Sequence, residues 1–340
     1  MKRILVTGGT GYIGSHTVVE LLEAGYEVII VDDLSNSKRE VLHRIKKVTG
    51  KEPIFYPYSL LDMASCESVF QKEKIDGIIH FAGFKAVGES VKDPLKYYEN
   101  NLYSTIVLLK LMKKYHVRNL VFSSSATVYG IPERSPILET METGKVFSPY
   151  GRTKYMIEEI LKDISLAEPS MNITLLRYFN PIGAHPSGEM GEDPNGIPNN
   201  LMPYITQVAI GKIKELGVFG NDYDTKDGTG VRDYIHVVDL AKGHLAALRK
   251  MEENPGLLIY NLGTGCGVSV LELVHAFEKA NHISIPYHIA PRRGGDIAIY
   301  YADSHKANEE LHWKAEYTIE DACRHSWNWQ TKNPKGYGDE

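Results

Sequence analysis

Residues 4–14 read ILVTGGTGYIG, and this short stretch decides the fold. The apolar start at 4–6 is typical of a buried β-strand, and Gly8, Gly11 and Gly14 then stand where a helix would begin. Because glycines carry no side chain, backbone N–H groups at the helix N-terminus can closely approach an anion such as a pyrophosphate. The same triplet can also form an ordinary tight turn, so the neighbouring sequence has to distinguish the two.

The sequence that follows the glycines favours a dinucleotide site. Apolar residues at 13, 18, 21 and 22 share one helical face, and the helix is predicted to stop at residues 24–25. The next apolar run, 28–31, ends at Asp32, 18 residues beyond Gly14. A carboxylate there can accept both ribose hydroxyls of an adenosine and repels a 2′-phosphate. We therefore expect the three glycines and Asp32 to bind NAD rather than NADP; the alternative for Asp32 is a solvated carboxylate at a strand end.

Up to about residue 177, short β-branched runs alternate with amphipathic stretches, which is typical of βαβ units around a parallel sheet. Six runs are continuous apolar strands, at 4–6, 28–31, 54–56, 78–81, 120–122 and 173–176. The expected fold is α/β, a Rossmann-like doubly wound parallel sheet with a smaller C-terminal α/β domain for the substrate. We place the domains at 1–180 and 181–340, with segments near 232–262 returning to the first.

The second half of the chain is less regular. Residues 181–203 carry nine glycines and prolines, and a long irregular loop in a compact chain is usually functional or a boundary. Helices are predicted at 237–251, 268–280, 304–311 and 318–330. An earlier helix at 95–115 has four consecutive apolar residues, so its apolar surface extends around more than one side. That helix is either buried within its own subunit or forms a homodimer interface with a helix near 150–165.

Tyr150 and Lys154 form a Tyr-x-x-x-Lys pair that opens an amphipathic stretch. At i and i+4, the phenol and the ammonium lie on one helical face. A phenol is a poor base at neutral pH, but a neighbouring ammonium and a cationic nicotinamide both stabilise the phenolate and lower its pKa. Such a pair alone is usually a helix-surface contact. Together with the glycine turn, and with Ser125 at a strand end, it predicts that Tyr150, Lys154 and Ser125 are catalytic, although Ser125 could be only a local cap.

Composition excludes several classes of protein. The chain has 38 Lys and Arg and 43 Asp and Glu, a net charge of −5, so it lacks the basic stripe that binds nucleic acid. Cys66, Cys266 and Cys323 are far apart and match neither a disulfide framework nor a metal-binding pair, so no metal is expected. The first apolar run is too short for a signal peptide, and no run of about 18 apolar residues follows. We expect a cytoplasmic protein with no membrane or nucleic-acid partner.

Seven segments carry a specific resemblance, and they are spread over essentially the whole chain. They are VTGGTGYIGSH at 6–16, HFAGFKAVGES at 80–90, SSSATVYG at 123–130, RYFNP at 177–181, GEDP at 191–194, NNLMP at 199–203 and GTGVRDYIH at 228–236. With them the chain resembles the extended short-chain dehydrogenase/reductase family and, within it, the UDP-glucose (UDP-galactose) 4-epimerases. The resemblance implies reversible C4 epimerisation of UDP-glucose and UDP-galactose through a 4-keto sugar that takes its hydride back from NAD on the other face.

The resemblance also implies roles for individual residues. Tyr150 is the acid/base, Lys154 holds the nicotinamide ribose, and Ser125 contacts the reacting hydroxyl. Besides these and Gly8, Gly11, Gly14 and Asp32, the residues that match cofactor contacts are Tyr12, Ile13, Asn36, Ser59, Leu60, Phe81, Ala82, Lys85, Asn100 and Tyr178. The residues that match the UDP-sugar site are Asn180, Asn200, Leu201, Phe219, Arg232, Arg293, Asp296 and Tyr300. Ser59 departs from the family pattern, in which Asp is common, but a hydroxyl still accepts a hydrogen bond.

Two matches at the sugar end also have a physical reason. A guanidinium fork suits a pyrophosphate, which favours a ligand role for Arg232 and Arg293 over the surface salt bridge that most arginines form. The resemblance places Tyr300 beside the sugar's C2 substituent. A phenol there fills the space that an acetamido group needs, so weak activity on UDP-N-acetylhexosamines is expected unless Tyr300 is only a packed strand residue.

Other functions remain as alternatives at this point. One is an epimerase that also accepts UDP-N-acetylhexosamines. Another is a nucleotide-sugar 4,6-dehydratase, although the resembling dehydratases carry Asp-Glu where this chain has Ala126 and Thr127. The third, a non-catalytic NAD-sensing module, is disfavoured by the joint presence of Tyr150, Lys154 and Ser125.

Overall fold

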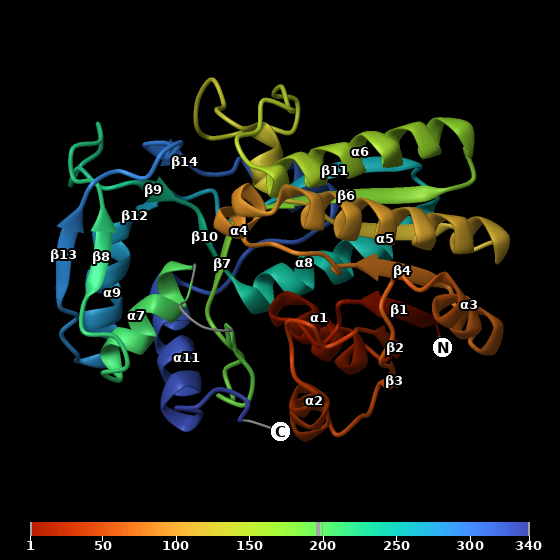
Figure 1. The fold of residues 1–340 in the computed structure, drawn as a ribbon, viewed down its shortest axis with the longest axis horizontal. Helices are drawn as coiled ribbons and strands as arrows, with labels where there is room; N and C mark the ends of the chain where they lie inside the picture. Colours follow the sequence, from red (N-terminus) through yellow and green to blue (C-terminus); the bar gives the residue numbers. More distant parts are fainter. Residues whose placement is uncertain (1, 195–197, 199, 339–340) are drawn as a thin grey trace.

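A seven-stranded parallel sheet forms the centre of the molecule, which a computed structural model describes for residues 2–194, 198 and 200–338 (Figure 1). The strand order is β11-β6-β5-β4-β1-β2-β3, a doubly wound arrangement. The strands are β1 (Arg3–Thr7), β2 (Glu27–Val31), β3 (Ile54–Tyr56), β4 (Gly77–His80), β5 (Asn119–Ser123), β6 (Asn172–Tyr178) and β11 (Leu257–Leu262). All six predicted runs are strands of this sheet, and β11 is a seventh strand that the prediction did not count.

Helices cover both faces of the sheet, which is why its strands are apolar throughout. One face carries α1 (Tyr12–Glu23), α2 (Glu40–Thr49) and α8 (Val237–Lys250), which share a core that includes Val18, Ile45 and Leu240. The other face carries α3 (Met63–Lys72), α5 (Pro94–Lys114) and α6 (Pro149–Ala167), whose core includes Leu111 and Ile157. The short helix α4 (Val87–Lys92) precedes α5, and a 3₁₀ turn, η1 (Ala126–Tyr129), follows β5.

The end of α1 confirms the prediction at residues 24–25. Gly25 takes φ +87°, and the next N–H, that of Tyr26, donates to the carbonyl oxygen of Leu21 at 3.0 Å. This is the left-handed cap that glycine adopts without steric cost. It turns the chain directly into β2, whose end carries Asp32.

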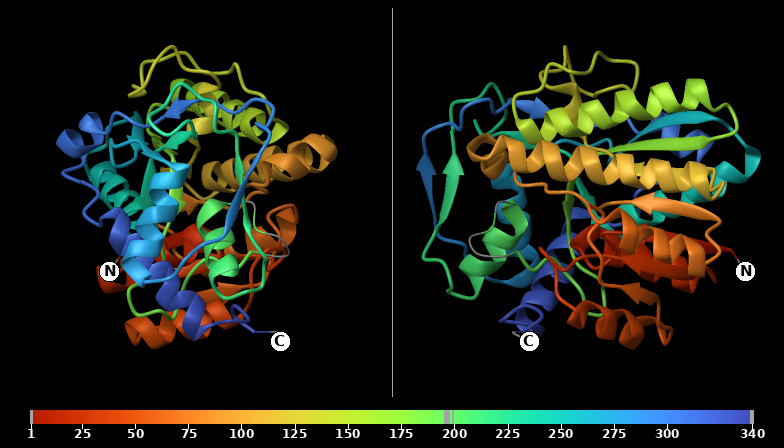
Figure 2. Two further views of the ribbon diagram at one scale, coloured as in Figure 1. Left: turned by 90° about the vertical axis from the view of Figure 1, so that its left-hand side faces the viewer. Right: turned by 45° about the vertical axis from the view of Figure 1, so that its right-hand side comes forward.

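The C-terminal elements form a smaller α/β unit beside the carboxyl edge of the large sheet (Figure 2). Its short strands pair in three small sheets, β10-β7, β12-β9-β14 and β13-β8. The strands are β7 (Asn180–Ile182), β8 (Leu216–Phe219), β9 (Val231–Arg232), β10 (Tyr234–His236), β12 (Val268–Ser269), β13 (Tyr287–Ala290) and β14 (Ile299–Tyr300). The helices of this unit are α7 (Leu201–Ala209), α9 (Val270–Asn281) and α11 (Ile319–Lys332). The helix α10 (His305–Glu310) instead packs against β11 of the large sheet, and a 3₁₀ turn, η2 (Met251–Glu253), follows α8.

Most predicted features of this half are confirmed. The four predicted helices correspond to α8, α9, α10 and α11 within two residues at each end. Of the irregular stretch 181–203, residues 183–194 form neither helix nor strand, α7 begins at Leu201, and residues 195–197 and 199 lie outside the described part of the chain. The core of this unit includes Ile205, Val274 and Phe277.

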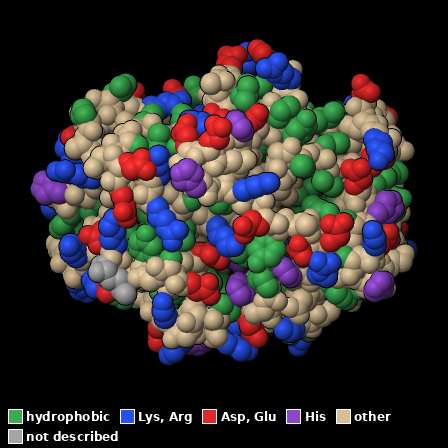
Figure 3. All heavy atoms as spheres, turned by 180° about the vertical axis from the view of Figure 1, so that it is seen from behind, with side chains coloured by type: hydrophobic (Ala, Val, Ile, Leu, Met, Phe, Trp, Pro, Cys, Tyr) green, Lys and Arg blue, Asp and Glu red, His purple; other side chains and the backbone are tan. Residues whose placement is uncertain are grey.

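Neighbouring strands β1 and β4 define the point at which the sheet order reverses, and ligands of doubly wound sheets bind at the carboxyl ends of such strands. A cavity of about 1080 Å³ lies there, between the sheet and the C-terminal unit. On the face seen from behind the view of Figure 1, acidic and basic side chains are interspersed (Figure 3). No helix within the described residues is long and apolar enough to cross a bilayer.

Candidate active site

The glycine turn between β1 and α1 is packed too tightly for a side chain at Gly8 or Gly14. Gly8 takes φ +70°, and a Cβ on it would lie 2.8 Å from the backbone nitrogen of Ala82. A Cβ on Gly14 would lie 2.2 Å from the carbonyl oxygen of Gly8. The N-cap of α1 is Gly11, which has no side chain to cap the helix and which lines the cavity. The N-terminus of α1 therefore offers a pyrophosphate its backbone N–H groups at close range.

Asp32 is held rigidly at the end of β2, beside this turn. Its carboxylate accepts hydrogen bonds from the backbone N–H of Thr10 and of Leu34, both at 3.0 Å, and from Ser37 Oγ at 3.2 Å. Carboxylate oxygens have further lone pairs, and Asp32 lines the cavity, so it can also accept ribose hydroxyls. The glycine cradle and this fixed carboxylate fit NAD and disfavour a 2′-phosphate.

Tyr150 and Lys154 stand in the first turns of α6, on the floor of the same cavity. The helix begins with Ser148 as its N-cap, whose Oγ accepts the N–H of Gly151 at 3.1 Å. Both the phenol and the ammonium are buried. Lys154 Nζ donates to the carbonyl oxygen of Ser123 at 2.8 Å, which fixes the ammonium at the end of β5.

The electrostatics of this pair differ from the prediction. Burial is the largest influence on the Tyr150 phenol and raises its pKa, and a hydrogen bond with Ser125 opposes this rise. With no cofactor bound, the net shift of the Tyr150 pKa is therefore opposite to the predicted lowering, and the positive charge of a bound nicotinamide is the further contribution that would lower this pKa. Burial lowers the pKa of Lys154 itself to about 8, while Glu158 raises it.

At the far end of the cavity, β9 and β14 bring Arg232 and Tyr300 side by side. Arg232 Nη1 donates to the carbonyl oxygen of Ile297 at 2.7 Å, and Arg232 Nη2 lies 3.4 Å from Asp296 Oδ1. The Tyr300 hydroxyl donates to the carbonyl oxygen of Ala126 at 2.5 Å, so this phenol joins the sugar end to the turn that follows Ser125. These hydrogen bonds fix the positions of the Arg232 guanidinium and the Tyr300 ring.

The cavity of about 1080 Å³ brings together all but three of the predicted site residues. Those that line it are Gly8, Gly11, Tyr12, Ile13, Gly14, Asp32, Asn36, Ser59, Leu60, Phe81, Ala82, Lys85, Asn100, Tyr150, Lys154, Tyr178, Asn180, Asn200, Arg232, Arg293, Asp296 and Tyr300. Such a volume exceeds that of most single-ligand pockets, so it leaves room for a cofactor and a substrate together.

The three predicted residues that do not line the cavity are Ser125, Leu201 and Phe219. Ser125 lies behind Tyr150, and its Oγ accepts the N–H of Thr127 at 3.2 Å as the N-cap of η1. Leu201 starts α7 and packs against the core of the C-terminal unit. Phe219 ends β8, and its ring lies 3.8 Å below the guanidinium of Arg293, so it reaches the cavity only through that side chain.

Sequence reasoning missed Asp233, a buried carboxylate that joins the segments of the sugar end. Its oxygens accept the N–H of Thr264 at 2.8 Å and the N–H of Ala302 at 3.1 Å. Its own backbone N–H donates to Tyr300 and its carbonyl accepts from Asn180, at 3.2 and 3.0 Å. The signal was available, because Asp233 follows Arg232 in the segment GTGVRDYIH. Tyr337 also lines the cavity, and no motif marks it.

Comparisons with known proteins agree with this geometry. The model of the NAD dependent epimerase/dehydratase family matches residues 4–263. A UDP-glucose 4-epimerase from Bacillus subtilis is 60% identical over 334 residues, which cover 98% of each chain.

Solved structures agree as well. A UDP-glucose 4-epimerase from Bifidobacterium longum, in complex with NAD⁺ and UDP, is 57% identical with a TM-score of 0.95, over 98% of this chain and 100% of that one. A second, from Stenotrophomonas maltophila with bound NAD and formylated UDP-arabinopyranose, is 48% identical with a TM-score of 0.96, over 98% and 99% of the two chains. The chain belongs to the NAD dependent epimerase/dehydratase family and, within it, to the UDP-glucose 4-epimerases.

Proposed function

We propose that this protein interconverts UDP-glucose and UDP-galactose at C4 with NAD as its cofactor. One observation carries the proposal: Tyr150 and Lys154 line the same cavity as the glycine turn at one end and Arg232 at the other. When bound, NAD supplies a reversible hydride acceptor at C4 of the hexose, so the reaction has no net oxidation. The protein supplies binding, orientation and proton transfer.

Tyr150 is the proton acceptor and donor of this reaction. Its buried phenol is neutral at pH 7 in the absence of ligands, because burial raises its pKa. The positive charge of bound NAD⁺ would favour loss of the Tyr150 proton. With the cofactor bound, the Tyr150 phenolate, stabilised by the hydrogen bond from Ser125, accepts the 4-hydroxyl proton of the sugar and returns it when the hydride is returned. Lys154, whose pKa is about 8, is mainly protonated at neutral pH and places its positive charge one helical turn away. The proposal also keeps the prediction that Lys154 binds the nicotinamide ribose.

The sugar end binds the nucleotide firmly and the hexose loosely. Arg232 and Arg293 bind the pyrophosphate, and Arg232 is preset by its hydrogen bond to the backbone of residue 297. Asn180, Asn200 and Asp296 complete the polar wall. Epimerisation requires the 4-keto hexose to rotate about its link to the pyrophosphate. The hexose is free to rotate because only the nucleotide is bound tightly.

Incubation with UDP-galactose, followed by separation of the products, tests this function. UDP-glucose is the expected product. A stable 4-keto-6-deoxy sugar would instead show a dehydratase, and unchanged substrate would show a non-catalytic NAD-binding protein. A parallel incubation with UDP-N-acetylgalactosamine tests whether N-acetylated sugars are also accepted.

We also propose that the protein is a cytoplasmic homodimer joined through α5 and α6. These helices pack on each other and still expose large apolar side chains, with Tyr103 at 43%, Met156 at 37% and Leu166 at 81% relative exposure. A second copy of the same helices would cover such a face with closed two-fold symmetry. Light scattering at micromolar concentration should give about twice the chain mass of 38.2 kDa. The monomer mass would refute the dimer, and recovery with the membrane or secreted fraction would refute the location.

A further inference from the structure

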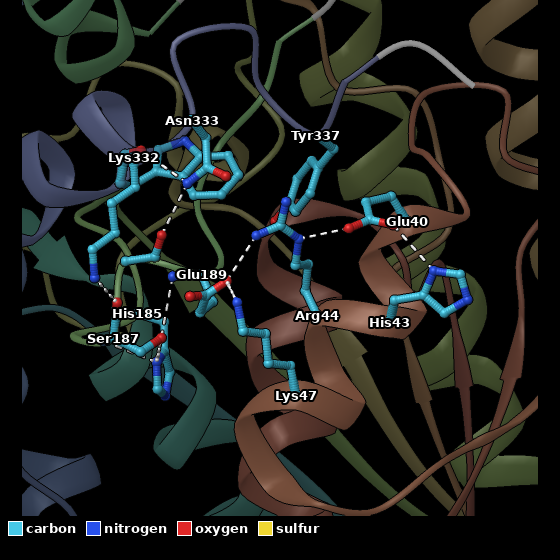
Figure 4. Close-up of polar contacts among 12 residues, drawn as sticks. Glu40, His43, Arg44, Lys47, His185, Ser187, Glu189, Lys332, Asn333 and Tyr337 are labelled. Carbon is cyan, nitrogen blue, oxygen red and sulfur yellow. Dashed lines mark hydrogen bonds and ion pairs between the residues drawn. The ribbon is translucent and has the colours of Figure 1, made fainter.

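Residues 185–193, here called the strap, run between α2 and α11 beside the C-terminal end of the described chain (Figure 4). On its α11 side the strap is held through its backbone. Lys332 Nζ donates to the carbonyl oxygen of Ser187 at 2.7 Å, and Asn333 Nδ2 donates to that of Gly188 at 2.9 Å. The first half of the strap is thus fixed to the C-terminal unit.

On its other side the strap is held by charge. Glu189 Oε2 lies 2.7 Å from Arg44 Nη1 and 2.9 Å from Lys47 Nζ, and both bases project from α2 (Figure 4). Arg44 is in turn fixed by Glu40, whose Oε1 accepts from Arg44 Nε at 2.7 Å. The Arg44 and Glu189 side chains are only 22% and 20% exposed, so their ion pair is better shielded from solvent than most surface pairs, whereas the Lys47 side chain is 63% exposed.

The two acidic residues at the end of the strap repeat this pattern. Glu192 Oε1 lies 3.1 Å from Lys85 Nζ, and Asp193 Oδ2 lies 3.5 Å from Lys38 Nζ. These four side chains line the cavity, whereas Glu189 lies outside it. All three acids of the strap therefore pair with bases of the cofactor-binding half of the molecule, and Lys38 stands near Asp32 in the loop that follows β2.

The strap also positions Tyr337, whose ring lines the cavity. The Tyr337 hydroxyl donates to the carbonyl oxygen of Gly191 at 3.1 Å, and its backbone N–H donates to Asp193 Oδ2 at 2.9 Å. The ring packs on Trp329 with centroids 4.7 Å apart, and a Cβ on Gly191 would lie 2.4 Å from that indole. The strap and Tyr337 thus form one packed wall that depends on both halves of the molecule.

This wall stands on the side of the cavity where Asp32 would hold the adenosine ribose. Tyr337, Glu192 and Asp193 line the same cavity as Asp32, and Glu189 ties the strap that carries the two acids to α2. We propose that Glu189 is a positioning residue that keeps the strap and Tyr337 closed over NAD, so that its ion pairs set the rate at which NAD leaves. The inference rests on NAD as the cofactor of the proposed function and goes beyond it.

The test measures release of radiolabelled NAD⁺ from loaded protein after a chase with excess unlabelled NAD⁺. In Glu189→Gln the label should leave about 3- to 10-fold faster, the effect of losing the partly shielded ion pair to Arg44 and the more exposed one to Lys47. Added NaCl should speed release from the wild type more than from the variant, because salt weakens the pairs that the variant lacks. The control is Glu252→Gln. It removes an ion pair in which Glu252 Oε1 lies 2.6 Å from Lys2 Nζ, and neither residue lines the cavity, so the rate should be unchanged.

A second pair of variants tests the wall without relying on charge. Tyr337→Ala should release NAD faster than Tyr337→Phe, because phenylalanine keeps the ring that lines the cavity. Equal release from the wild type, Glu189→Gln and Tyr337→Ala, or a salt response that Glu189→Gln leaves intact, would overturn the inference while the proposed function stands. Wild-type protein that takes up no NAD would refute both.

Discussion

Replacing Glu158 by Gln should destabilise the protein strongly, because Glu158 and Arg177 form a buried ion pair with side chains 0% and 2% exposed. Arg177 Nη2 donates to Glu158 Oε2 at 2.6 Å, and Ser124 Oγ donates to Glu158 Oε1 at 2.6 Å. Glu158→Gln keeps the shape but leaves the guanidinium charge without its counter-charge. Loss of one partner of such a pair costs about 3–5 kcal/mol, and we expect a loss of that size in the free energy of unfolding in urea.

The same substitution should change the pH dependence of catalysis. Glu158 stands one helical turn from Lys154 and raises its pKa, whereas burial lowers that pKa to about 8. Without the Glu158 charge the ammonium loses its proton at a lower pH than in the wild type. In the proposed mechanism the charged form of Lys154 supports catalysis, so activity should decline with rising pH at a lower pH in Glu158→Gln. The measurement is a profile of kcat between pH 6 and pH 10.

Two controls make this reasoning refutable. Glu159→Gln, at the next position of α6, removes an ion pair to Lys162 whose glutamate is 46% exposed, and it should cost less than about 1 kcal/mol. Adding Arg177→Met to Glu158→Gln should restore much of the stability, because no buried charge is then unpaired. Equal losses in Glu158→Gln and Glu159→Gln would show that the buried pair is not what stabilises this part of the fold.

Three further predictions concern the cavity. Tyr150→Phe should still bind NAD but epimerise roughly 10²- to 10⁴-fold more slowly, and near-wild-type turnover would assign proton transfer to another group. The dissociation constant should be lower for NAD⁺ than for NADP⁺, and Asp32→Asn should narrow that difference; equal constants in the wild type would refute the role of Asp32. Tyr300→Cys should raise kcat/KM for UDP-N-acetylgalactosamine by roughly 5- to 150-fold, the worth of about 1–3 kcal/mol of overpacking. Wild-type protein that already converts both sugar classes equally would contradict the steric role of Tyr300.

Much of the large sheet could be predicted because each of its strands is a short continuous apolar run, which buried parallel strands require. β11 was harder to assign for a physical reason. It pairs with β6, yet the strands β7 to β10, the helices α7 and α8 and the strap lie between the two in the chain, and sequence order says nothing of that pairing. The pairing depends on α8, which leads into this segment and packs on α1.

Some residues of the candidate site could likewise be predicted from the sequence, and others could not. The glycine turn, Asp32 and the Tyr150–Lys154 pair could be predicted because each depends on local spacing next to a strand or within one helix. Leu201 and Phe219 were matched to the UDP-sugar site, but Leu201 packs against the core of the C-terminal unit and Phe219 lies under the Arg293 side chain, so their contact with the substrate stays a prediction. The pKa of Tyr150 also depends on burial, which i to i+4 spacing does not reveal.

The place of β11 at the edge of the sheet has a consequence for how the chain folds. A fragment ending near residue 180 would leave the backbone edge of β6 unpaired and the apolar face of α1 uncovered by α8. Exposed strand edges and apolar faces are templates for aggregation. The sheet is therefore complete only after residue 262 has left the ribosome. Until then the nascent chain must avoid pairing β6 with the strand edges of other molecules.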